Sequence, residues 1–86
     1  MFYTYLLRSD KDGKFYTGFT NDLRKRFKEH QQSLSTYTKG RGLYKLIYYE
    51  ACMNQVDART RELYLKSGMG KRYIKNRLKR FLALTG

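Results

Sequence analysis

Residues 3–30 read YTYLLRSDKDGKFYTGFTNDLRKRFKEH, and this stretch decides the fold. Residues 2–8 are rich in aromatic and β-branched side chains and form too short a run for a helix, which favours a strand. The Asp12-Gly13 pair tolerates the positive φ of a hairpin turn, so residues 15–20 are expected to return as an antiparallel strand. A glycine inside that strand, Gly18, is typical of a bulge or of a close approach by another backbone or a ligand.

A helix is expected directly after the hairpin. Asn21 or Asp22 is suited to cap its start, and apolar spacing predicts that it covers about residues 22–34. Its inward positions recur at helical spacing and are Leu23, Phe27, His30 and Leu34. Arg26 and His30 lie four residues apart and therefore share one flank of the helix.

The remaining elements follow from the same kinds of pattern. Residues 43–51 are apolar enough on both sides to form a strand that is covered on both faces. Asn54 is expected to open a second helix that ends at Gly68. Residues 68–70 contain two glycines and are expected to break the chain, and residues 71–82 read as a third helix. The order is that of a folded α+β domain, with residues 1–86 forming one unit.

The composition indicates the kind of partner. The chain has 86 residues, with 19 Lys and Arg against 7 Asp and Glu, and a formal net charge of +12. Such a charge is typical of proteins that bind a polyanion, either nucleic acid or an anionic membrane surface. One cysteine and one histidine cannot form an internal disulfide or a structural zinc site. The amino terminus has no signal-peptide pattern, so a soluble cytoplasmic protein is expected.

Individual side chains have an ordinary interpretation and a functional one. His30 alone would be a packed core histidine, and Arg26 alone a solvated charge. Neighbouring antiparallel strands could bring Tyr5 and Tyr16 to the same small area beside them. Together the four favour a phosphate-handling group, in which the guanidinium binds a phosphoryl oxygen and His or Tyr carries a proton.

One carboxylate has an unexpected position. Ala58, Glu62 and Leu65 fall within about 60° of one another on a helix with 100° per residue, which places Glu62 on a mostly apolar stripe. Such a glutamate is often paired with a neighbouring Lys or Arg. The alternative is that Glu62 holds one hydrated Mg²⁺, which takes one or two protein carboxylates together with substrate phosphate. A clustered acidic set for two metals is not evident.

The ordered set of these residues resembles the GIY-YIG nuclease domain, especially the small stand-alone bacterial proteins related to the nuclease domain of the DNA-repair excinuclease. The set comprises Tyr3-Thr4-Tyr5, Tyr16-Thr17-Gly18, Arg26, His30 and Glu62, and the likeness extends over nearly the whole chain. The resemblance implies an α+β fold with a three-stranded antiparallel sheet flanked by about three helices, in the order β-β-α-β-α-α. It also implies hydrolysis of nucleic-acid phosphodiesters, with DNA as the expected substrate, with one divalent ion, Mg²⁺ or Mn²⁺, and a role in DNA repair or processing.

The family's functional residues can be carried over by position. The resemblance implies catalytic roles for Tyr5, Tyr16, Arg26, His30 and Glu62, with Glu62 as the metal ligand. Two departures stand out. The first triplet reads Tyr-Thr-Tyr where the family has Gly-Ile-Tyr, and Phe19 stands where some members carry a lysine. Asn76 matches a polar residue that some members carry in the last helix.

Binding is expected to rest on phosphate contacts, with weak sequence preference and steep salt dependence. The expected contact residues are Lys39, Arg41, Lys71, Arg72, Lys75 and Arg77, together with Asn76. A monomer that binds nucleic acid and no membrane is expected, with a protein partner for targeting. Two alternatives stay open: a nucleic-acid binding module that keeps the fold without hydrolysis, and a basic peptide on a membrane surface.

Overall fold

The computed structural model describes residues 1–32 and 43–85. The elements, in chain order, are β1 (Phe2–Ser9), β2 (Phe15–Thr20), α1 (Leu23–Gln31), β3 (Tyr44–Cys52), α2 (Gln55–Lys66), α3 (Gly68–Arg77) and α4 (Lys79–Thr85). The α+β class and the order of the strands agree with the prediction, with four helices in place of about three. Within these ranges no helix is long and apolar enough to cross a bilayer.

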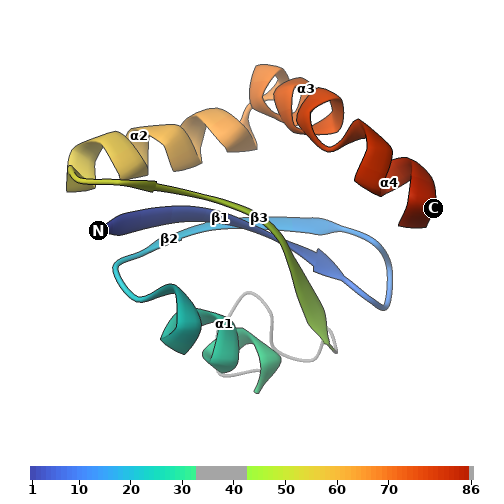
Figure 1. Ribbon diagram of the computed structural model, residues 1–86, viewed down its shortest axis with the longest axis horizontal. Helices are drawn as coiled ribbons and strands as arrows, with labels where there is room; N and C mark the ends of the chain where they lie inside the picture. The colour runs from blue at the N-terminus through green and yellow to red at the C-terminus, as the bar shows by residue number, and fades with distance from the viewer. Residues whose placement is uncertain (33–42, 86) are drawn as a thin grey trace.

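The three strands form one antiparallel sheet in the order β2-β1-β3, so that β1 is central and β2 is an edge strand (Figure 1). Gly13 adopts φ 72° in the β1–β2 turn, which is the positive φ predicted for this hairpin. The register places Tyr5 opposite Gly18 and Leu7 opposite Tyr16. Paired residues share a face of the sheet, so both tyrosines project to the same side.

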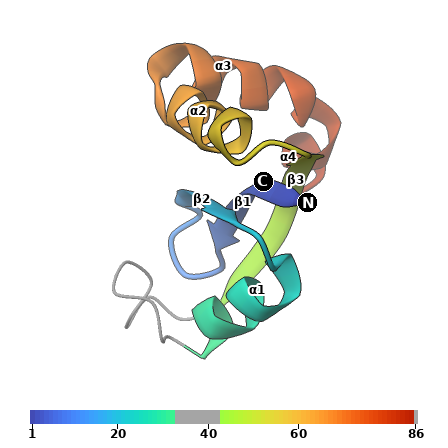
Figure 2. The same ribbon diagram turned by 90° about the vertical axis from the view of Figure 1, so that its left-hand side faces the viewer.

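Helices cover both faces of the sheet (Figure 2). On one face, Tyr5, Leu7 and Tyr44 form a buried cluster against Leu23 and Phe27 of α1. On the other face, a second cluster joins α2 and α3 to β1, and its buried members are Leu6, Leu65 and Ile74. Successive side chains of β1 thus pack into the two clusters on opposite faces of the sheet, which explains the continuous apolar run of this strand.

Side-chain caps fix the starts of α1 and α2. The Asp22 carboxylate accepts a hydrogen bond from the Lys25 amide at 3.1 Å, and the Asn54 side chain accepts from the Val56 amide at 2.8 Å. The sequence predicts Asn54 as a cap and leaves Asn21 and Asp22 as the two candidates for the first helix, of which Asp22 is the cap. Helix α1 ends at Gln31, earlier than the predicted residue 34, and Leu34 lies outside the described residues.

The predicted chain break at residues 68–70 is wrong. Ser67 ends α2 and caps α3, because its side-chain oxygen accepts from the Gly70 amide at 3.2 Å, and α3 begins at Gly68. A Cβ atom on Gly70 would overlap the backbone of Tyr64, so this glycine permits a close approach of α2 and α3. The single predicted helix over residues 71–82 is also wrong, since Leu78 ends α3 and α4 follows.

Candidate active site

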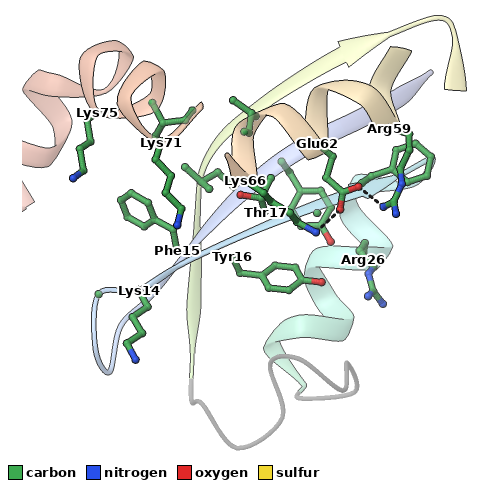
Figure 3. Close-up of a pocket in the computed structure, with 17 residues that line it drawn as sticks. Lys14, Phe15, Tyr16, Thr17, Arg26, Arg59, Glu62, Lys66, Lys71 and Lys75 are labelled. Atoms are coloured by element: carbon green, nitrogen blue, oxygen red, sulfur yellow. Dashed lines mark hydrogen bonds and ion pairs between the residues drawn. The ribbon is translucent and has the colours of Figure 1, made fainter. Parts of the chain in front are cut away.

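A cleft straddles the edge strand β2 and takes its walls from both sides of the sheet (Figure 3). Tyr5 and Tyr16 of the hairpin and Arg26 of α1 line the side of β2 that faces α1. Glu62 of α2 lines the other side, in the same cleft. Four of the five predicted catalytic side chains therefore converge, although they come from four different elements.

Gly18 allows Tyr5 to reach this cleft. A Cβ atom on Gly18 would overlap the Tyr5 ring at its hydroxyl end, so the ring lies directly across the glycine backbone. Tyr5 is 1% exposed, and its ring contacts that of Tyr16 at a centroid distance of 6.5 Å. The close approach at Gly18 is thus made by a side chain of the neighbouring strand, and not by the backbone or ligand that was expected.

Gly18→Ala is expected to lower the free energy of unfolding by roughly 1–3 kcal/mol, because the added methyl group overpacks a closed site. It should also displace the Tyr5 hydroxyl. Urea unfolding measures the first effect and the NMR shifts of the His30 ring measure the second. Gly68→Ala is the matched control, because a Cβ atom there meets no atom within 4 Å. Equal stability of the two variants would contradict this packing.

His30 lies behind the cleft and not among the residues that line it. Its side chain is 0% exposed, and its Nε2 atom is 2.9 Å from the Tyr5 hydroxyl oxygen. Its ring meets the Tyr16 ring edge-on at a centroid distance of 4.9 Å. Burial, together with the nearby charge of Arg26, lowers the pKa of His30 to about 4. A neutral His30 between two tyrosines can hold Tyr5 in place.

This burial predicts a pH dependence of stability. His30 binds a proton below about pH 6.5 in the unfolded chain but only near pH 4 in the folded protein. The contribution of His30 to stability is therefore complete above pH 6.5 and is lost as the pH falls toward 4, a change of about 2–3 kcal/mol. Urea unfolding at pH 7, 5.5 and 4.5 measures it. His30→Gln should flatten the slope by that amount, and an unchanged slope would contradict a neutral buried His30.

Arg26 joins the two phenols. Its guanidinium forms hydrogen bonds with both Tyr5 and Tyr16. The Arg26 Nη1 atom also lies 3.7 Å from the Glu29 Oε1 atom. Burial raises the pKa of Tyr5 to about 12, although the hydrogen bond from Arg26 acts in the opposite direction. Tyr5 therefore remains a neutral hydrogen-bond donor at physiological pH. Tyr16 is half-buried and has its hydroxyl in the cleft beside the guanidinium (Figure 3).

Glu62 is 4% exposed and carries ion pairs on both oxygens. Arg59 bonds Oε1, and the Lys66 Nζ atom lies 3.0 Å from Oε2. The pairing with neighbouring cations that the sequence left open is therefore present. The same carboxylate faces the cleft, so pairing does not remove it from the site (Figure 3).

The donor set fits one hydrated divalent ion. Glu62 is one carboxylate in an open cleft, where water and phosphate oxygens could complete an octahedral shell. Across residues 1–32 and 43–85, no group of three His, Cys, Asp or Glu side chains could hold a metal by itself.

The predicted nucleic-acid contacts divide into three groups. Lys71 and Lys75 of α3 line the cleft. Three other predicted residues of α3 are exposed but lie outside the lining, namely Arg72, Asn76 and Arg77. Lys39 and Arg41 lie outside the described residues.

Sequence reasoning missed three cations that line the cleft: Lys14, Arg59 and Lys66. A signal for two of them was present. Arg59 and Lys66 lie three residues before and four residues after Glu62, which are the spacings at which helical side chains meet. Lys14 belongs to the hairpin turn, and only the fold brings it to the cleft.

A three-stranded sheet carries, at its edge strand β2, a cleft lined by two phenols, a guanidinium and a carboxylate. This arrangement is the one expected of an α+β nuclease domain. Comparison with known proteins agrees, because the family model "GIY-YIG catalytic domain" matches residues 1–79. The chain belongs to this nuclease family and, within it, to the UPF0213 proteins.

Two UPF0213 relatives illustrate the similarity. The protein from Clostridium perfringens is 46% identical over 67 residues, which cover 77% of this chain and 71% of the relative. The protein from Pediococcus pentosaceus is 36% identical over 85 residues, which cover 98% and 88%. Among solved structures, the solution NMR structure of UPF0213 protein BH0048 from Bacillus halodurans is similar with a TM-score of 0.54. It is 34% identical, with 88% of this chain and 84% of that chain covered.

Proposed function

We propose that this protein is a divalent-metal-dependent endonuclease that hydrolyses nucleic-acid phosphodiesters, with DNA as the principal substrate. One observation carries the proposal: Tyr16, Arg26 and Glu62 come from three elements and line a single cleft. The net charge of +12 favours a polyanionic substrate. The resemblance to the excinuclease nuclease domain favours a role in DNA repair or processing.

Each cleft residue has a role that its surroundings support. Tyr16, in its phenolate form, takes a proton from the attacking water, whose oxygen bonds to phosphorus while one P–O ester bond breaks, and the leaving oxygen takes a proton from solvent. The products are a phosphate monoester and a free hydroxyl. Arg26 stabilises the phenolate form of Tyr16 by its charge and binds a phosphoryl oxygen through its planar fork. Tyr5 donates a hydrogen bond to water or phosphate.

His30 and Glu62 have supporting roles, one in orienting Tyr5 and the other in holding the metal ion. His30 is neutral and hydrogen-bonded to Tyr5, so it orients the phenol and is ill placed to carry protons to the cleft. Glu62 would hold the metal ion. An ion bound there would supply Lewis-acid charge to the phosphate and the leaving oxygen.

A cleavage screen tests this function. Branched, nicked, flapped and single-stranded DNA and matching RNA are incubated with the protein in Mg²⁺, in Mn²⁺ and in EDTA. Cleavage that requires the metal and leaves a phosphate monoester supports the proposal. If every substrate stays intact at high protein concentration in both metals, the proposal fails.

A second candidate is a nucleic-acid binding module that keeps the fold without hydrolysis. Phe19 favours it, because some family members carry a lysine at this position. The same screen separates the two functions, since a binding module shifts the mobility of the DNA without cutting it.

Binding is expected to depend steeply on salt. About five phosphate contacts from cleft and α3 cations would lower the affinity about 10²–10³-fold between 50 and 200 mM salt. Fluorescence anisotropy with labelled DNA in EDTA measures this slope. Lys71→Gln should reduce this slope by about one unit, the contribution of one phosphate contact. Lys45→Gln should leave the slope unchanged, because Lys45 lies on β3 outside the cleft lining. Binding that is independent of salt would contradict a phosphate-based interface.

A further inference from the structure

Lys66 is the last residue of α2 and lies one helical turn beyond Glu62. Its side chain is 50% exposed, and its ammonium group reaches back to the Glu62 carboxylate at 3.0 Å. It lines the same cleft as Tyr16 and Arg26. Figure 3 shows its tip between Glu62 and Tyr16, whereas Arg59 lies on the far side of Glu62.

Phe19 lies on the same side of the sheet as Lys66 but carries no charge. Phe19 is paired with Thr4, so the two side chains share one face of the sheet. The Thr4 hydroxyl donates a hydrogen bond to the Ala58 carbonyl of α2 at 2.8 Å, which shows that α2 covers this face. A lysine at position 19 would therefore extend into the cleft on the Glu62 side. In this chain Phe19 stacks on Phe2 at a centroid distance of 6.4 Å and offers no charge.

Lys66 approaches the same region from the opposite wall. Its ammonium group is partly exposed and sits on a flexible stem, so it can exchange one anionic partner for another without refolding. Glu62 shares its two oxygens between Lys66 and Arg59. If Glu62 bound a divalent ion, Lys66 would lose its ion pair with Glu62. Its ammonium group would then be available to a phosphate of the substrate.

We propose that Lys66 binds a phosphoryl oxygen of the scissile phosphate from α2, on the wall of the cleft opposite Phe19. The proposal rests on the nuclease function proposed above. It makes Lys66 a contact residue of the substrate and not merely a partner that holds Glu62.

The test uses two readouts. In the first, Lys66→Met should lower the cleavage rate by about 100-fold, whereas Arg59→Met, the matched removal of the other Glu62 partner, should lower it less than about 5-fold. Adding Phe19→Lys to Lys66→Met should recover at least about 10-fold, and Phe19→Met in its place should recover nothing. Circular dichroism melting confirms that each variant is folded.

The second readout does not need cleavage. With Glu62→Gln as the background and EDTA present, Lys66 has no carboxylate partner at position 62. Adding Lys66→Met should then reduce the slope of log affinity against log salt by about one unit, which is the contribution of one phosphate contact. Phe19→Lys should restore the slope. If the parent cuts nothing while the slopes follow this order, the nuclease proposal fails and the phosphate contact stands. An unchanged slope, or a cleavage loss that Arg59→Met shares and Phe19→Lys does not rescue, would overturn the assignment of Lys66.

Discussion

Glu62→Gln should abolish cleavage, with a loss of at least about 10³-fold, and should leave DNA affinity within about 3-fold of the parent. The amide has nearly the same shape but lacks the charge that a divalent ion requires. Folding should be retained, because the two cations that lose their partner are half-exposed, with side-chain exposures of 56% for Arg59 and 50% for Lys66. Single-turnover cleavage and anisotropy in Mg²⁺ measure the two quantities.

Glu50→Gln is the matched control for this variant. Glu50 also forms an ion pair on the α2 side of the sheet, with the Arg61 Nε atom at 2.9 Å, but it does not line the cleft. Its replacement should leave cleavage within a factor of about two. A fully active Glu62→Gln protein, or equal losses in both variants, would remove Glu62 from the site.

Tyr16→Phe is expected to reduce cleavage by about 10²–10⁴-fold, the usual range for the loss of a group that transfers a proton. Packing should survive, because the ring keeps its edge contact with His30 and its contact with Tyr5. The unfolding free energy should therefore change by less than about 1 kcal/mol. Cleavage rates over pH 6–10 and urea unfolding measure the two effects.

Tyr49→Phe provides the control, since Tyr49 is a 55% exposed tyrosine of β3 outside the cleft. Its cleavage should equal that of the parent. If Tyr16→Phe cuts as fast as the parent at every pH, another group accepts the proton and the mechanism above is incorrect.

The hairpin and its tyrosines could be predicted because their signals are local. Alternation places Tyr5 and Leu7 on one face, and the Asp12-Gly13 turn sets the antiparallel return that brings Tyr16 beside them. Glu62 was identifiable for a similar reason, since a carboxylate between Ala58 and Leu65 on a helical stripe must be buried. The family, the α+β class and the order of the strands along the chain follow from these features.

Other features depend on tertiary packing. The glycines at 68 and 70 are weak helix formers, but Ser67 caps α3 and Gly70 lets that helix approach α2 closely, so packing overrides propensity. The sequence places His30 on the inward side of its helix, but the hydrogen bond between His30 and Tyr5 depends on the folded hairpin. Likewise, Lys14 lies in a turn whose sequence does not indicate that it lines the same cleft as Lys71 and Lys75 of α3.

The central claim is that one cation and one phosphate meet between Glu62, Tyr16 and Arg26. A crystal structure with Mn²⁺ and an oligonucleotide that carries a non-hydrolysable linkage tests it most directly, since anomalous scattering locates the ion. We predict a manganese peak at about 2.1 Å from a Glu62 carboxylate oxygen, with a phosphate oxygen in the same coordination shell and Arg26 on that phosphate. Manganese bound elsewhere, or a phosphate backbone that bypasses the β2 cleft, would contradict the account.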